Sequence, residues 1–143
     1  MQMTLEYWNS LANQMLLICS LLSGFSITIV ANLIISEKAD KLTNRLLKTA
    51  TISAGCFLVA LFAMTKISMT TTPGGYLQDV TEDDFLLARI IGMFTFMIGL
   101  FALSFLIALS GWTKSKKMGI FTTVVGVVCL LLILITLTDV GFN

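Results

Sequence analysis

The side chains best suited to chemistry in this chain are hydroxyls and amides along its first apolar segment. They are Asn13, Gln14, Ser20, Ser23, Ser26, Thr28 and Asn32. In a helix of 100° per residue, one narrow stripe holds Asn13, Ser20, Gly24 and Ala31, and Thr28 flanks it. Polar groups in hydrocarbon are costly unless they are satisfied, so they should face other helices or water. Two interpretations follow: a pore-lining helix, or interhelical hydrogen bonds in a packed core.

The residue types that enzymes use for proton transfer and metal binding are scarce. The chain has no histidine, which is the commonest general base and metal ligand. Its cysteines, Cys19, Cys56 and Cys129, lie inside apolar segments and form no CxxC pair, so we interpret them as small packing residues. No acidic residue lies near the middle of an apolar segment. We therefore predict that the protein is not an enzyme, and we expect no metal site and no cofactor.

Four long apolar segments carry these residues and occupy most of the 143-residue chain, at about 13–35, 49–69, 85–111 and 118–137. Each reaches the ~20 residues that a helix needs to cross a ~30 Å hydrocarbon layer. The composition is 57% hydrophobic and 12% charged, against roughly 25% charged in soluble domains. We predict an all-α polytopic membrane protein, a single four-transmembrane-helix bundle over residues 1–143.

Charge differs between the connections. The first and third connections are basic and hold Lys38, Lys41, Arg45, Lys48, Lys114, Lys116 and Lys117. The second is acidic and holds Asp79, Glu82, Asp83 and Asp84. Because loops rich in lysine and arginine stay in the cytoplasm, we predict both termini outside. The first ten residues carry Glu6 and no Lys or Arg, unlike a secretory signal, and with the short chain this favours a bacterial inner membrane.

The basic first connection has a second feature, because residues 41–48 alternate apolar and basic side chains at helical spacing. We expect the second helix to begin there, before its apolar segment, with basic residues that meet anionic headgroups of membrane lipids. A cytoplasmic protein partner is an alternative use of this surface. Nothing in the sequence points directly to nucleic acid.

Small residues mark the faces where membrane helices approach closely. The third segment carries Gly92 and Gly99 at such positions, and the fourth carries Gly119 and Gly126. With the small residues of the first segment, this pattern suits a tight bundle, a homo-oligomer, or both.

The stretch Leu21-Leu-Ser-Gly-Phe-Ser26 resembles the start of the pore helix in the Orai family of calcium channels. That family has four spans and assembles around its first helix, so the resemblance implies that the first span lines a pore. The filter glutamate of the family would fall at Asn32, so calcium selectivity is not implied. The family also keeps its termini in the cytoplasm, whereas the charges here predict termini outside.

These observations lead to ranked hypotheses. The first is a homo-oligomeric channel or pore lined by the first helix through Asn13, Ser20, Gly24, Thr28 and Asn32. The second is a membrane anchor or sensor subunit whose basic loops recruit a cytoplasmic partner. A membrane enzyme or carrier ranks last, because the chain offers no nucleophile–base pair, metal-ligand set or glycine-rich phosphate loop.

Overall fold

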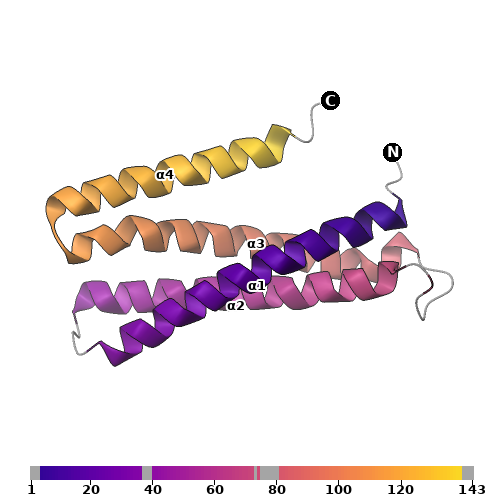
Figure 1. Ribbon diagram of the computed structural model, residues 1–143, viewed down its shortest axis with the longest axis horizontal. Helices are drawn as coiled ribbons and strands as arrows, with labels where there is room; N and C mark the ends of the chain where they lie inside the picture. Colours follow the sequence, from indigo (N-terminus) through magenta and orange to yellow (C-terminus); the bar gives the residue numbers. More distant parts are fainter. Residues whose placement is uncertain (1–3, 37–39, 73, 75–80, 140–143) are drawn as a thin grey trace. The chain divides into compact units, whose positions relative to one another are not determined.

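The computed structural model describes residues 4–36, 40–72, 74 and 81–139 (Figure 1). In chain order the elements are α1 (Leu5–Ile35), α2 (Lys41–Thr71), α3 (Glu82–Ser110), the 3₁₀ helix η1 (Gly111–Thr113) and α4 (Lys116–Asp139). The described residues form no β-strand, and their four α-helices are long and apolar enough to cross a membrane. The prediction of an all-helical chain with four long apolar helices is confirmed.

The helices extend beyond the apolar segments. Helix α1 begins at Leu5, well before the predicted span, and α2 begins at Lys41, as the helical spacing of the first connection led us to expect. Lys38, part of the predicted basic surface, lies outside the described residues. Polar side chains thus continue each helix past its apolar part, since a helix satisfies its own backbone in water as well as in lipid.

Side-chain caps hold the starts of α1, α3 and α4. At α1 the Thr4 hydroxyl accepts from the Tyr7 N–H at 3.4 Å. At α3 the Asp84 carboxylate accepts hydrogen bonds from the backbone N–H and the hydroxyl of Thr81, each at 3.0 Å. The carboxylate three residues into the helix thus reaches back to the residue that precedes it. At α4 the Ser115 hydroxyl accepts from the Met118 N–H at 3.3 Å.

The chain forms two compact units, and α1, α2 and α3 each contribute residues to both. The first unit comprises Met1–Phe25 and Ala54–Gly99, and the second comprises Ser26–Ser53 and Leu100–Asn143. Helix α4 belongs wholly to the second unit.

The core of the first unit is built around Trp8. Its ring lies 5.9 Å from the ring of Phe85, and the Arg89 guanidinium lies over it at 4.9 Å. A second aromatic pair, Phe57 and Phe96, packs edge to face at 6.0 Å. The remaining buried members of the Trp8 cluster are Ala12, Met64, Ile67 and Ala88. Aromatic contacts therefore join all three helix segments of this unit.

The core of the second unit is aliphatic, with Leu46, Ala50 and Leu106 at its centre. Helix α4 attaches near its start, where the Thr122 and Thr123 hydroxyls each lie 3.2 Å from the Ala108 carbonyl oxygen. Both hydroxyls also lie within hydrogen-bond distance of carbonyls of α4, Thr122 at 3.1 Å from Met118 and Thr123 at 2.7 Å from Gly119. Farther along α4, exposed side chains include Val124, Val128, Leu131, Leu132 and Ile135. So large an apolar surface requires lipid or another protein to cover it.

Candidate functional site

Helix α1 has a buried side and an exposed polar side. Ala12, Cys19, Ser23 and Ser26 are buried. The predicted pore-lining residues Asn13, Ser20, Gly24, Thr28 and Asn32 are all exposed in the single chain. The polar residues of the first segment therefore divide into a buried set and an exposed set.

The buried set makes contacts inside the protein. In the second unit the hydroxyls of Ser26 and Ser53 share a hydrogen bond of 3.2 Å, and both side chains are fully buried. In the first unit the buried hydroxyl of Ser23 has no hydrogen-bond partner among the described residues. Ser26 thus supports the interhelical interpretation, because its hydroxyl joins α1 to α2 away from any surrounding solvent.

The exposed set has room beside it. A Cβ added at Gly24 would meet no other atom within 4 Å. The Ser20 hydroxyl donates to the carbonyl of Leu17 at 2.9 Å, so its hydrogen is used within the helix. Its oxygen can still accept a hydrogen bond. Ser20, Thr28 and Asn32 consequently present polar atoms on a surface that the chain itself does not cover.

Asn13 is exposed but also ties α1 to α2 in the first unit. Its side-chain Nδ2 donates to Asn9 Oδ1 at 3.0 Å, and its side-chain Oδ1 accepts from the Ser68 hydroxyl at 2.8 Å. The Asn9 amide in turn donates to the Ser68 carbonyl at 2.9 Å and to Thr71 Oγ1 at 3.3 Å. Sequence reasoning missed Asn9, although two amides one helical turn apart at a helix end were a usable signal.

In the first unit, both predicted packing glycines face side chains of α2. A Cβ added at Gly92 would lie 3.0 Å from Ala63 Cβ and 2.8 Å from Met64 Cε. One added at Gly99 would lie 2.9 Å from the ring of Phe57. A larger residue at either position would push neighbouring side chains aside.

In the second unit, the predicted packing glycines of α4 face η1 and α3. A Cβ added at Gly119 would lie 2.5 Å from the Trp112 ring, whose indole N–H donates to Thr123 Oγ1 at 3.2 Å. A Cβ at Gly126 would lie 3.0 Å from the Ser104 carbonyl oxygen and 3.3 Å from the Ala108 nitrogen. These neighbours are backbone atoms, which cannot move aside as a flexible side chain can. The absence of a side chain at Gly126 therefore allows α4 to approach α3 closely.

The described members of the basic surface are all exposed: Lys41, Arg45, Lys48, Lys114, Lys116 and Lys117. In the second unit, a pocket of about 420 Å³ brings the two basic connections together. Its lining includes Asp40 and Thr43 from the start of α2, and Trp112 and Lys114 from the turn before α4. The first and third connections therefore meet at one end of this unit.

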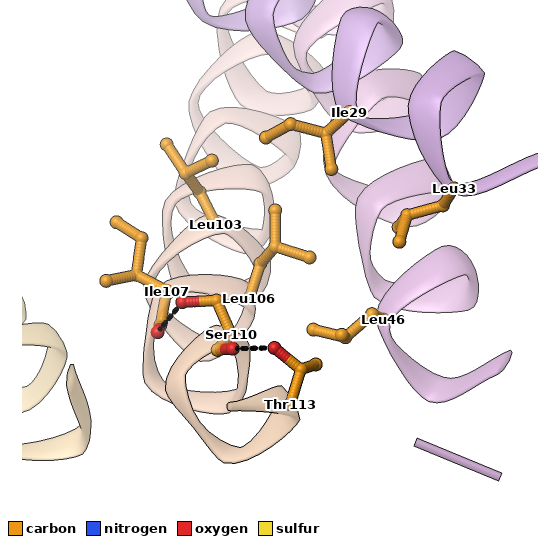
Figure 2. A pocket seen from close by; sticks show the side chains of 8 residues that line it. All are labelled: Ile29, Leu33, Leu46, Leu103, Leu106, Ile107, Ser110 and Thr113. Carbon is orange, nitrogen blue, oxygen red and sulfur yellow. Dashed lines mark hydrogen bonds between the residues drawn. The ribbon is translucent and has the colours of Figure 1, made fainter. Parts of the chain in front are cut away.

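An apolar groove of about 360 Å³ adjoins that pocket (Figure 2). Ile29 and Leu33 of α1 and Leu46 of α2 face Leu106 of α3 across it. The lining also includes Leu103 and Ile107 of α3. Ser110 and Thr113 lie at one end, where the Thr113 hydroxyl donates to the Ser110 carbonyl at 2.7 Å. Volumes of roughly 300–1,000 Å³ are typical of ligand sites.

Among the described residues, no three His, Cys, Asp or Glu side chains are grouped to hold a metal ion. No family model, curated protein or solved structure matches this chain.

Proposed function

We propose that this chain is an integral membrane protein of a bacterial inner membrane whose copies associate into a channel or pore lined by α1. Four helices of sufficient length and apolarity support the membrane assignment. The alternation of basic, acidic and basic connections supports an orientation with both termini outside.

The exposed polar side of α1 carries the pore proposal. Ser20, Thr28 and Asn32 are exposed in the single chain, whereas the chain's own packing uses the side with Cys19 and Ser26. In a bilayer, hydroxyl and amide groups that face acyl chains lose hydrogen bonds with water. When several copies of the chain associate with this side of α1 toward a shared water-filled axis, these groups keep their hydrogen bonds with water.

The proposed lining is neutral, which defines the class of permeant. Hydroxyls and amides replace part of the hydration shell of an ion or small solute but do not select charge strongly. Asn32 stands where the Orai resemblance would place a filter glutamate, so we expect weak selectivity and no preference for calcium. Ions or small solutes would move down their gradients.

Flux through proteoliposomes tests the proposal directly. We expect the purified protein to release a trapped small ion, and Thr28→Leu to lower the rate about tenfold, because a polar site in the pore becomes apolar (~1.4 kcal/mol). Phe25→Leu is the matched control, since Phe25 is an exposed apolar residue of the same helix. Absence of flux from folded, oligomeric protein, or equal flux in the Thr28 variant, would contradict a pore lined by α1.

A second candidate function is an anchor or sensor subunit that recruits an acidic cytoplasmic protein. The exposure of Lys41, Arg45 and Lys48 on α2, and of Lys114, Lys116 and Lys117 before and at the start of α4, favours it. Purification in mild detergent distinguishes the two functions. A stoichiometric partner that is lost when the last three lysines are changed to Gln supports recruitment, and purification of the chain alone argues against it.

A further inference from the structure

An apolar groove and a polar pocket of the second unit form one continuous feature. They share the lining residues Leu33, Leu46 and Thr113. The groove is walled by leucine and isoleucine side chains of three helices (Figure 2). The pocket adds Ser36, Asp40, Leu42, Thr43, Trp112 and Lys114.

Three segments of the chain line this feature, and each runs from apolar residues in the groove to a polar or charged residue in the pocket. Along α1 and just past its end the order is Ile29, Leu33, Ser36. Toward the start of α2 it is Leu46, Thr43, Leu42, Asp40, so one apolar side chain stands between the hydroxyl and the carboxylate. From α3 into the following turn the order is Leu103, Ser110, Lys114. A phospholipid has this same order of groups, from acyl chain through ester to charged headgroup.

The pocket is lined by one carboxylate and one ammonium group. Asp40 and Lys114 line the same pocket, and neither side chain has a hydrogen-bond or ion-pair partner within the described part of the chain. The hydroxyls of Ser36, Thr43 and Thr113 stand with them. An ammonium group on the protein complements a phosphate, and a carboxylate complements a cationic amine, so a zwitterionic headgroup satisfies both.

We propose that this feature binds one phospholipid with a phosphoethanolamine headgroup. The phosphate pairs with Lys114, the primary ammonium donates hydrogen bonds to Asp40, and one acyl chain occupies the groove beside Leu103 and Leu106. This inference rests on the proposed insertion in a membrane but not on the proposed pore.

Two related headgroups define the selectivity. A choline headgroup carries the same charges, but its methylated ammonium has no N–H to donate to Asp40. A glycerol headgroup keeps the phosphate for Lys114 and brings no positive charge to the carboxylate. The site should therefore prefer ethanolamine over both, because only that headgroup combines a phosphate for Lys114 with a cation that donates hydrogen bonds to Asp40.

Native mass spectrometry of the full chain in detergent measures this preference. Dioleoyl lipids with ethanolamine, choline or glycerol headgroups are titrated separately, so that the acyl chains are identical. We expect one ethanolamine lipid to bind about tenfold more tightly than either of the others. Asp40→Asn should abolish that preference, whereas Asp83→Asn, at an exposed carboxylate outside the pocket, should keep it.

Two further variants test the phosphate and acyl ends. Lys114→Gln should weaken all three lipids, while Lys117→Gln, exposed and outside the lining, should not. Leu103→Trp should fill the groove and weaken binding whatever the headgroup, with Leu131→Trp on exposed α4 as control.

Equal affinity for the three headgroups, or a preference that survives Asp40→Asn in a folded protein, would overturn the assignment. Either result leaves ion flux as a separate measurement, so failure of this site and failure of the pore are distinguishable.

Discussion

Ser26 and Ser53 illustrate how single hydroxyls act in this protein. They lie 27 positions apart in sequence and share a hydrogen bond at full burial in the second unit. A hydrogen bond between helices in an apolar setting contributes modestly, about 0.6 kcal/mol on average and up to about 1.7. Its contribution to the stability of the whole protein is therefore small. Its main effect is to favour the pairing of these sides of α1 and α2.

This pair can be measured with a double-mutant cycle. We expect Ser26→Ala and Ser53→Ala to be coupled by about 0.6 kcal/mol in the free energy of unfolding, because either change alone removes the shared bond. Unfolding in mixed micelles, followed by circular dichroism, gives the four values. Ser20→Ala is the control, since its hydroxyl bonds within α1, and strictly additive effects of Ser26 and Ser53 would contradict the pairing.

At the scale of elements, the attachment of α4 depends on close backbone approach in the second unit. Gly126 faces Ser104 and Ala108 of α3, and the Thr122 and Thr123 hydroxyls reach the Ala108 carbonyl. Beyond these contacts most side chains of α4 are exposed. The helix is therefore held mainly through its first half.

Enlarging Gly126 should release that attachment. We expect Gly126→Ile to lower the free energy of unfolding by about 1–3 kcal/mol, because its Cβ would lie 3.0 Å from a backbone oxygen that cannot give way. Val128→Ile is the matched control, because Val128 is an exposed residue of the same helix. Equal stability of the two variants in a denaturant titration would show that α4 does not need this glycine.

At the scale of the whole molecule, the charges of the connections predict the orientation. The acidic second connection is expected outside, and the basic first and third connections are expected inside. The pocket that joins Asp40 to Lys114 agrees with a common end for the two basic connections in the second unit. Both termini should then lie on the side of Asp83.

Cysteine labelling tests this orientation. In a variant without the three native cysteines, we expect Asp83→Cys to react with an impermeant maleimide on intact cells. Asn44→Cys, at an exposed position near the start of α2, should react only after permeabilisation. The reverse pattern would place the termini inside, as in the Orai family.

Much of the element structure followed from local sequence. Residues 41–48 predicted an early start for α2 because apolar and basic side chains alternate there at helical spacing, and the helix does begin at Lys41. Local sequence alone does not specify how the start of α3 is capped. Thr81 and Asp84 are both good capping residues, and only the backbone geometry at the helix start decided which side chain accepts.

The sequence by itself determined that this chain forms four long apolar helices with a polar first helix. Helix formation and the hydrophobicity of a segment depend on the residues within that segment. Only the tertiary structure decided which hydroxyls of α1 are buried. Ser23 and Ser26 resemble Ser20 and Thr28 in polarity and spacing, and the contacts that separate them come from residues far along the chain. For the same reason, the pocket of Asp40 and Lys114 became visible only when distant connections were brought together.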